Sequence, residues 1–379
     1  MKMESSMAKS KSVSIYADTE FGKLLECAMR DDGESDTYIK AFFGKANDEE
    51  RVSVGLPPTG NHKMTTGSSD DKSHRPQIFA DLIGQEKAKR QLRYLIDSAK
   101  KRGAPLEHVL LVGPKGLGKT SFAGVIANEM GGKFKPILGA SMSSSEMESV
   151  FDDMTPDNPD ILFIDELHRV PQKTQELLYT AMEDFKYYKS TYGVYGTHKS
   201  FEVSLPGYTL IGATTEEGKL ADPFRERFGM IVRLEFYSEA ELTEIICHDA
   251  ATQTPISMKT ALNIAQRSKG VPRVAKTIYR RLRDVLLTTD CTEEEALKTL
   301  QTDMGIDELG LTQIDRKYMG AVLSLGNASL ATLGSMTGEE PTNIKETVEP
   351  FLLRMGFVGI TSRGRHLTSK GIKYLLKGQ

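Results

Sequence analysis

A glycine-rich segment, Gly113 to Thr120, constrains the fold of this chain more than any other feature of its sequence. The segment reads GPKGLGKT, follows the apolar run 109–112 and precedes residues 121–130, in which apolar positions recur at helical spacing. A strand, a glycine-rich loop and a helix in this order form a phosphate-binding loop, whose backbone N–H groups face the phosphates of a nucleotide. Lys119 would contact the β- and γ-phosphates of ATP, and the Thr120 hydroxyl would hold Mg²⁺. The segment therefore predicts a nucleotide-binding α/β domain.

Length and composition restrict the class of protein. The chain has 379 residues, which is enough for roughly two to four domains. Its three cysteines show no C-x-x-C spacing, so structural zinc and a disulfide framework are disfavoured and a reducing interior is expected. No apolar run reaches the length of a membrane span, and the N-terminus lacks a signal-peptide core. We expect a soluble, cytoplasmic protein with no membrane partner, while the net charge of -3 does not decide whether it binds nucleic acid.

The first 72 residues differ in composition from the rest of the chain. They are rich in Ser, Lys, Asp, Glu and Gly, and only residues 21–29 have the pattern of a short amphipathic helix. This composition predicts a largely flexible N-terminal extension.

An acidic pair marks the second element of the nucleotide site. From Ala80 onward, apolar runs alternate with helical patterns, which predicts a parallel sheet with a second strand at 136–138. The run 161–164 is continuously apolar, as in a strand buried on both faces, and it ends in Asp165 and Glu166. Because ligands bind at the carboxyl ends of such strands, Asp165 would orient Mg²⁺ and Glu166 would polarise the attacking water. A surface turn is the usual explanation for an isolated Asp-Glu pair, but its place downstream of a phosphate loop favours function.

Two further segments of this domain indicate contacts with other molecules. Residues 186–203 alternate aromatic and polar side chains around glycines, which predicts a projecting β-hairpin and favours a partner surface over a solvated ribbon. Arg225 and Arg227 precede the apolar run 230–234. Ring-forming ATPases need an arginine that neutralises charge on a neighbour's γ-phosphate, although two arginines here could also be surface charges.

The C-terminal part of the chain is predicted to be mostly helical. Capping boxes begin helices at Ser238 and Thr292, and the segment 270–273 begins another with proline in its first turn. Helical patterns at 313–325, 329–336 and 343–355, followed by a tight basic hairpin, suggest a winged helix after residue 311. Residues 350–379 contain six Lys and Arg residues and no Asp or Glu, a charge distribution that suits a DNA backbone.

The ordered series of motifs resembles that of the RuvB family, the Holliday-junction branch-migration ATPases of the AAA+ class. The resemblance covers roughly residues 74–377, and this series of motifs is specific to that family within its class. In order, the motifs are DLIGQE (81–86), the phosphate loop, DELHR (165–169), AMEDF (181–185), IGATT (211–215), RERFG (225–229), RLEFY (233–237), GVPR (270–273) and RGR (363–365).

This resemblance implies a motor with an α/β ATPase domain at 73–236, a helical lid at 237–310 and a winged helix at 311–379. Six subunits would encircle duplex DNA and drive branch migration of Holliday junctions in recombination and repair, using ATP and Mg²⁺. RuvA, or a RuvA-like junction-binding protein, would dock on the hairpin at 186–203.

The resemblance also assigns roles to individual residues. Besides the acidic pair, catalytic roles fall on Thr215 as the sensor after the fourth strand, Arg227 as the trans-acting finger and Arg273 as the lid sensor. Nucleotide contacts fall on His74, Arg75, Gly113, Gly116, Gly118, Lys119, Thr120, Ser121, Glu183, Asp184, Phe185 and Tyr237. DNA contacts fall on Arg316 and Arg365, with Arg363 in the same basic turn. The chain departs from the family where it usually has arginines, at Glu216, Pro341 and Ile360.

Two other functions fit part of the pattern. A clamp-loader or helicase-loader ATPase shares the phosphate loop, the acidic pair and the finger, but such loaders generally lack the RLEFY run joined to a winged helix. A DNA-binding scaffold switched by nucleotide would not need to retain Lys119, Asp165, Glu166 and Arg227 together.

Overall fold

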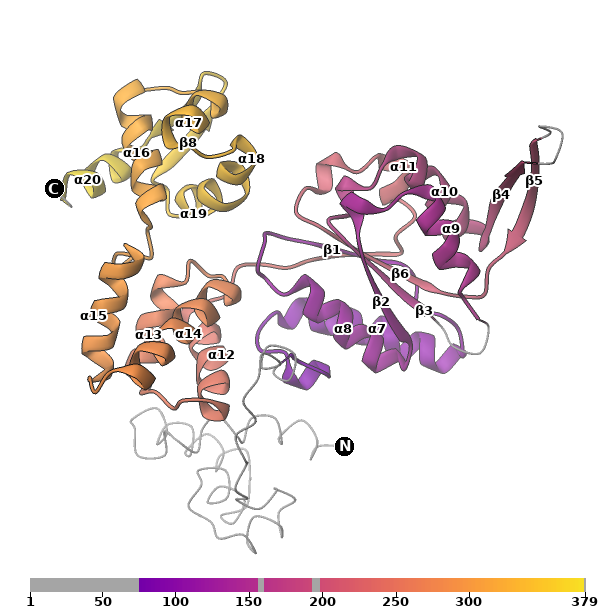
Figure 1. Cartoon of the computed structure of the whole chain (residues 1–379), viewed down its shortest axis with the longest axis horizontal. Coiled ribbons are helices and arrows are strands. Elements are labelled where there is room, and N and C mark those ends of the chain that lie inside the picture. Colours follow the sequence, from indigo (N-terminus) through magenta and orange to yellow (C-terminus); the bar gives the residue numbers. More distant parts are fainter. Residues whose placement is uncertain (1–74, 156–159, 193–197, 378–379) are drawn as a thin grey trace, which may run out of the picture. The chain divides into compact units, whose positions relative to one another are not determined.

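The computed structural model describes residues 75–155, 160–192 and 198–377 (Figure 1). These residues form two compact units, Arg75–Phe236 and the part of the chain from Tyr237 onward. The N-terminal extension expected at 1–72, with its helix at 21–29, lies outside the described residues. No helix in the described ranges combines the length and the apolar character that crossing a bilayer requires.

The first unit is built on a sheet of five parallel strands in the order β2-β3-β6-β1-β7. The strands are β1 (Val109–Val112), β2 (Lys133–Leu138), β3 (Asp160–Asp165), β6 (Thr209–Thr214) and β7 (Met230–Arg233). In the centre, Leu111 lies opposite Ala213 on one side and Val232 on the other, and all three are buried. The continuous apolar runs of the sequence therefore belong to strands covered on both faces.

Helices cover both faces of this sheet (Figure 1). Helices α7 (Glu86–Arg102) and α8 (Lys119–Met130) lie on one face, and α9 (Ser144–Asp152) and α10 (Gln172–Asp184) lie on the other. On the α9 and α10 face, Leu162 and Ile164 of β3 pack with Leu178 of α10 in one apolar core. The predicted α/β fold with a parallel sheet is confirmed.

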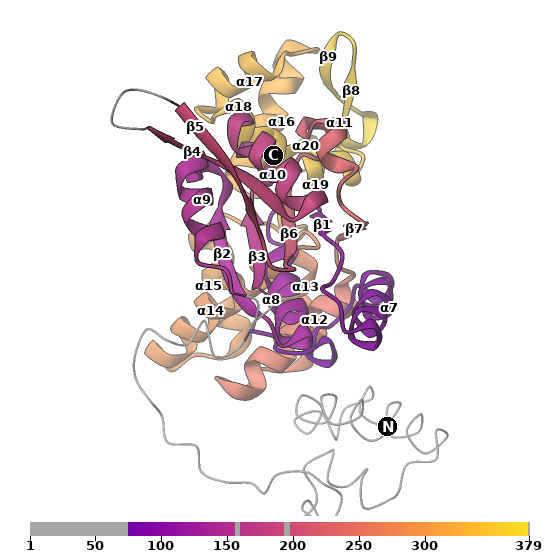
Figure 2. The same ribbon diagram turned by 90° about the vertical axis from the view of Figure 1, so that its right-hand side faces the viewer.

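A two-stranded antiparallel hairpin leaves the body of this unit, as Figure 2 shows. It consists of β4 (Lys186–Tyr192) and β5 (His198–Ser204), as the alternation of aromatic and polar residues predicts. Its base is fixed to α9, because the Tyr187 hydroxyl and the Lys189 ammonium both donate to the Asp152 carboxylate. Tyr188 and Phe201 are exposed along the ribbon.

The second unit begins with four helices, α12 (Glu239–Thr252), α13 (Met258–Arg267), α14 (Pro272–Thr288) and α15 (Glu293–Met304). Capping boxes form where the sequence predicts them: Ser238 accepts from the Glu241 N–H at 3.2 Å, and Thr292 accepts from the Glu295 N–H at 3.3 Å. Each pair supplies hydrogen-bond acceptors to backbone N–H groups that would otherwise have none at the start of a helix.

The remaining elements form a winged helix with its own apolar core, which includes Tyr318, Leu333, Leu352 and Phe357. Its helices are α16 (Gln313–Leu325), α17 (Leu330–Thr337), α18 (Pro341–Asn343), the π-helical η6 (Ile344–Val348), α19 (Glu349–Arg354) and α20 (Ser369–Lys377). The wing is the hairpin β8 (Val358–Thr361) and β9 (Gly364–Leu367). The helix expected at 343–355 is therefore a succession of shorter helical pieces.

Candidate functional site

The phosphate loop joins β1 to α8, and its conformation explains its glycines. Gly116 and Gly118 have φ angles of 82° and 98°, in the left-handed region that favours glycine. A Cβ at Gly113 would lie 2.9 Å from the carbonyl oxygen of Leu234, so only glycine fits this close approach. The Lys119 side chain is buried, and its Nζ donates to the carbonyl oxygens of Gly113 at 2.7 Å and Pro114 at 3.1 Å. The loop thus fixes a cation where α8 begins.

The two residues after Lys119 begin the helix. Thr120 and Ser121 are half-buried in the first turn of α8, whose N-cap is Gly118. The first N–H groups of a helix have no partner within it, so this turn presents backbone donors as well as the two hydroxyls.

The acidic pair lies at the carboxyl end of β3. Asp165 is the last residue of the strand, and one of its carboxylate oxygens accepts the Glu166 N–H at 3.0 Å. Glu166 has a φ angle of 53°, a left-handed conformation that is uncommon for a residue with a side chain. Such conformations cost free energy and cluster at functional sites. The turn directs the Glu166 carboxylate to the end of the next strand, β6, where the Thr215 hydroxyl donates to it at 3.4 Å.

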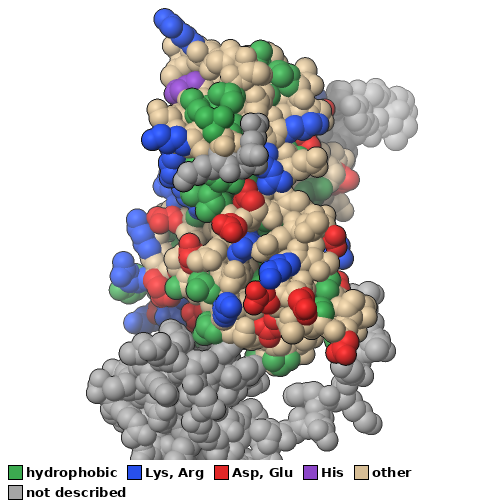
Figure 3. Space-filling model, turned by 90° about the vertical axis from the view of Figure 1, so that its left-hand side faces the viewer, with side chains coloured by type: hydrophobic (Ala, Val, Ile, Leu, Met, Phe, Trp, Pro, Cys, Tyr) green, Lys and Arg blue, Asp and Glu red, His purple; other side chains and the backbone are tan. Residues whose placement is uncertain are grey.

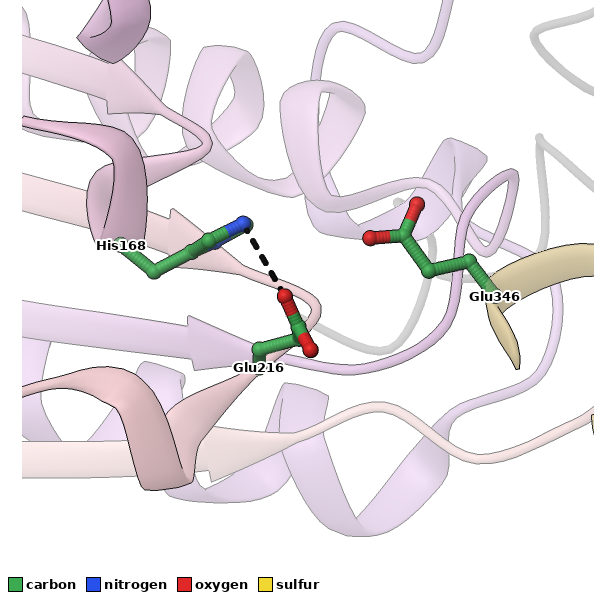
Figure 4. A group of neighbouring side chains, drawn as sticks. All are labelled: His168, Glu216 and Glu346. Carbon is green, nitrogen blue, oxygen red and sulfur yellow. Dashed lines mark ion pairs between the residues drawn. The ribbon is translucent and has the colours of Figure 1, made fainter. Parts of the chain in front are cut away.

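A histidine that the sequence motif contains, but to which no role was assigned, joins this group. His168 Nδ1 lies 3.0 Å from the Thr214 hydroxyl and 3.5 Å from a Glu166 carboxylate oxygen. Its Nε2 lies 3.5 Å from the Glu216 carboxylate, the ion pair drawn in Figure 4. Burial lowers the pKa of His168, and the two carboxylates oppose that shift. The sequence signal for this residue was its position two residues after Glu166. In the structure these residues form a 3-10 turn.

Gly212 of β6 brings the acidic turn and the arginine segment together. A Cβ on Gly212 would lie 2.6 Å from Leu167 Cδ2 and 3.2 Å from Phe228 Cζ. Leu167 directly follows Glu166, and Phe228 directly follows Arg227. Both apolar side chains therefore pack on the same glycine of the central sheet.

Arg227 follows the short helix α11 (Asp222–Arg225) and lies between two buried phenylalanines, Phe224 and Phe228. Its guanidinium donates to the Glu183 carboxylate at 2.8 Å. Glu183, for which the resemblance implies a contact with nucleotide, therefore contacts Arg227, the residue expected to be the finger. The neighbouring Arg225 forms an ion pair with Asp222 at 2.6 Å.

The other residues of the AMEDF motif have different surroundings. Asp184 is exposed at the end of α10. Phe185 is half-buried, and its ring packs edge-on against Tyr208 with centroids 5.8 Å apart. A left-handed φ angle of 53° at Phe185 ends the helix and turns the chain into β4.

The remaining expected nucleotide contacts come from other segments of the chain. Arg75 is exposed at the start of the first unit, and His74 lies outside the described residues. Tyr237 and Arg273 belong to the second unit. Tyr237 is buried, with its N–H donating to the Gly270 carbonyl at 3.0 Å, and Arg273 is exposed in the first turn of α14.

Two of the three expected DNA contacts make internal interactions. Arg365 donates to the buried Glu349 carboxylate at 2.8 and 3.3 Å, and this pairing raises the pKa of the arginine. Arg316 donates to the carbonyl oxygens of Gly305 at 2.7 Å and Leu311 at 2.8 Å, which joins α15 to α16.

Arg363 differs from both, because it is exposed at the turn of the wing. There it lines an open cavity of about 400 Å³ with Asn327, Thr361, Ser362 and His366. The upper part of the face in Figure 3 carries mainly Lys and Arg among its charged side chains, whereas acidic residues mix with basic ones below. Such a surface suits phosphate groups.

Three family models match the chain in succession. Residues 74–234 match the Holliday junction DNA helicase RuvB P-loop domain, residues 237–310 the RuvB AAA lid domain, and residues 308–376 the RuvB C-terminal winged helix domain.

Individual proteins show the same similarity over most of the chain. The Holliday junction branch migration complex subunit RuvB of Lactiplantibacillus plantarum is 40% identical over 315 residues, which is 81% of this chain and 93% of the relative. The protein of the same description from Lactobacillus johnsonii is 38% identical over 334 residues, or 86% and 95% of the two chains. The solved structure of the Thermotoga maritima RuvB Holliday junction branch migration motor has 35% identity and a TM-score of 0.70, covering 80% of this chain and 98% of that one.

Proposed function

This chain belongs to the RuvB family, and from that membership we propose that it is an ATP-driven motor for branch migration of Holliday junctions. The observation that carries the proposal is the arrangement at the ends of β1, β3 and β6. Three adjacent strands each supply one part of it. Strand β1 leads into the phosphate loop with its buried lysine, β3 leads to the carboxylate on a left-handed turn, and β6 leads to the threonine that contacts this carboxylate. We propose the functional boundaries 73–236 for the ATPase domain, 237–310 for the lid and 311–379 for the DNA-binding domain.

The residues at these strand ends have the chemistry that ATP hydrolysis requires. The Lys119 ammonium would bind the β- and γ-phosphates, and the first-turn N–H groups of α8 would bind phosphate oxygens. Glu166 would orient and polarise the attacking water, with Thr215 holding its carboxylate. Mg²⁺ bound with the nucleotide would neutralise phosphate charge, and Thr120 and Asp165 have the oxygen ligands that this ion prefers.

The other proposed contacts complete the site. We propose that Arg227 acts in trans on the nucleotide of the neighbouring subunit in a homo-hexamer, and that Arg273 senses the γ-phosphate from the lid. We propose further nucleotide contacts from His74, Arg75, Gly113, Gly116, Gly118, Ser121, Asp184, Phe185 and Tyr237. An arginine supplied in trans stabilises transition-state charge and raises turnover by roughly three to five orders of magnitude.

DNA and a junction-binding protein are the proposed partners. Duplex DNA would contact the winged helix, with the exposed Arg363 as its best-placed phosphate ligand among the three arginines considered. A RuvA-like protein would dock on the hairpin β4–β5, where Tyr188 and Phe201 are exposed. The tip of this hairpin, 193–197, lies outside the described residues.

A synthetic four-way junction tests the proposal. Full-length protein, with and without a RuvA-type junction-binding protein, should convert the junction into two duplexes only when ATP and Mg²⁺ are present. Lys119→Ala, which removes the cation at the phosphate loop, should abolish conversion. Lys115→Ala is the matched control, because this exposed lysine of the same loop should be dispensable. ATP hydrolysis without junction conversion under either condition would contradict the motor function.

A further inference from the structure

We infer that Tyr179 and Glu183 position the side chain of Arg227, so that the finger is already oriented before it meets a neighbour's nucleotide. We call these three residues the finger cluster. The inference rests on the proposed trans role of Arg227, and it gives Glu183 a role within its own subunit.

Three contacts in different directions fix the guanidinium of Arg227. One terminal nitrogen donates to the Pro223 carbonyl at 2.5 Å, and the other donates to Glu183 Oε2 at 2.8 Å. The guanidinium carbon lies 5.0 Å from the centroid of the Tyr179 ring, over its face. A free arginine side chain has many rotamers, and ordering it costs up to about 2 kcal/mol of entropy. Here that ordering is complete within one subunit, so it need not be repeated at each encounter with a nucleotide.

Tyr179, the aromatic member of the finger cluster, packs against the apolar core. The Tyr179 ring packs against Phe224 with centroids 5.2 Å apart, and Phe224 packs against Phe228 at 5.6 Å. Phe224 is fully buried. Because close-packed interiors resist displacement, Tyr179 can hold the guanidinium in one plane.

The position and the exposure of Glu183 suit a residue that orients the Arg227 side chain. It lies four residues after Tyr179 on α10, so both side chains are on the same face of the helix. Its side chain is 63% exposed, whereas that of Arg227 is 27% exposed. Since a guanidinium has five N–H donors, the bonds to Pro223 and Glu183 leave donors for a phosphate.

Two other roles for Glu183 predict different measurements. A carboxylate that contacts nucleotide directly, as the resemblance implies, would change nucleotide affinity when it is removed. A carboxylate that holds the arginine away from its target would raise turnover when it is removed. A positioning residue instead lowers kcat, leaves nucleotide affinity unchanged and has no effect once the arginine is absent.

A double-mutant cycle on the full chain decides among these roles. We expect Glu183→Ala and Tyr179→Leu each to lower kcat for ATP by roughly five- to fifty-fold, with KM and the Kd for a fluorescent ATP analogue unchanged. Tyr179→Phe keeps the ring and should retain nearly full turnover. In an Arg227→Ala background, Glu183→Ala should cause no further loss. Glu176→Ala is the matched control, because it removes an exposed carboxylate two turns earlier on the same helix and should have wild-type kinetics.

The possible results separate this inference from the proposed function. A raised Kd for nucleotide, an increased kcat, or equal losses from Glu183→Ala with and without Arg227 would overturn the positioning role. If Arg227→Ala itself turned over ATP at the wild-type rate, the trans-finger assignment would fail instead. Circular dichroism and oligomeric state, unchanged in all variants, verify that the losses are local.

Discussion

At the scale of single residues, His108 shows how a buried side chain makes the stability of this protein depend on pH. Its Nδ1 accepts the Leu210 N–H at 2.9 Å, and its Nε2 lies 3.1 Å from the Met182 carbonyl. These partners require a neutral ring with its proton on Nε2. Burial is the main cause that lowers the pKa of His108 from 6.5 to about 4. Protonation of Nδ1 would break the bond that ties this residue to β6.

This predicts a specific loss of stability in acid. Between pH 6.5 and about 4 the unfolded chain binds a proton at His108 and the folded chain does not, so the free energy of unfolding falls as pH falls. The full stability is present above pH 6.5, and its loss reaches roughly 3 kcal/mol by pH 4. Urea unfolding of wild type and His108→Gln at pH 7.5, 6 and 5 measures it. The variant should have the smaller pH dependence, and identical slopes for the two proteins would refute this origin.

The residues of the nucleotide site could be predicted from sequence only where a local motif carries them. The phosphate loop and the acidic pair belong to such motifs, whereas Thr215 was assigned only by the resemblance; the structure brings its hydroxyl to the Glu166 carboxylate. The contacts of His168 with Glu166 and Glu216 depend on how a 3-10 turn meets the end of β6. No local sequence pattern predicts this tertiary contact between the 3-10 turn and the end of β6.

At the scale of secondary-structure elements, long apolar runs and capping boxes predicted the elements well, and irregular segments were predicted less well. Helix α16 begins and ends at the predicted residues, 313 and 325. By contrast, β2 begins at Lys133 instead of 136, because its pairing with β3 extends the strand through the polar residues Lys133 and Lys135. Pairing with a neighbour is a tertiary property and overrides local propensity.

The wing provides a prediction at this scale, because its arginines have different surroundings. Arg365 pairs with Glu349, whose side chain is 2% exposed, so Arg365→Ala removes the cation from this buried carboxylate and leaves it the Tyr318 hydroxyl, which donates at 2.7 Å. We expect a loss of roughly 3 kcal/mol in the stability of the winged helix. Hydrogen exchange of the β8 and β9 amides measures this loss in the full chain.

Arg363→Ala is the matched control on the same hairpin. This exposed residue should leave hydrogen exchange unchanged, while duplex binding weakens similarly across sequences and the salt dependence becomes shallower. Unchanged exchange in Arg365→Ala, together with the loss of duplex affinity, would instead assign Arg365 to direct DNA contact.

At the scale of the whole molecule, a finger that acts in trans predicts complementation between two inactive proteins. Arg227→Ala should bind ATP and hydrolyse it very slowly, and Glu166→Gln should bind ATP without polarising water. A mixture of the two also forms interfaces where an intact Arg227 meets an intact Glu166. ATPase activity of the mixture should therefore exceed that of either variant alone. No recovery, in subunits shown to exchange, would place the arginine in its own active site and make Arg225 the next candidate for the trans role.

The close packing around Gly212 has a consequence for the proposed ring. Leu167, which follows Glu166, and Phe228, which follows Arg227, both pack on Gly212, where a Cβ would lie 2.6 Å from Leu167 and 3.2 Å from Phe228. A larger side chain at this position would displace both apolar side chains, because a close-packed interior leaves no space for it. Gly212→Ala should therefore disturb the Glu166 turn and the Arg227 segment together. In the proposed ring, a change at Glu166 of one subunit would thereby reach the Arg227 that the same subunit offers to its neighbour, and this would give the ring a direction.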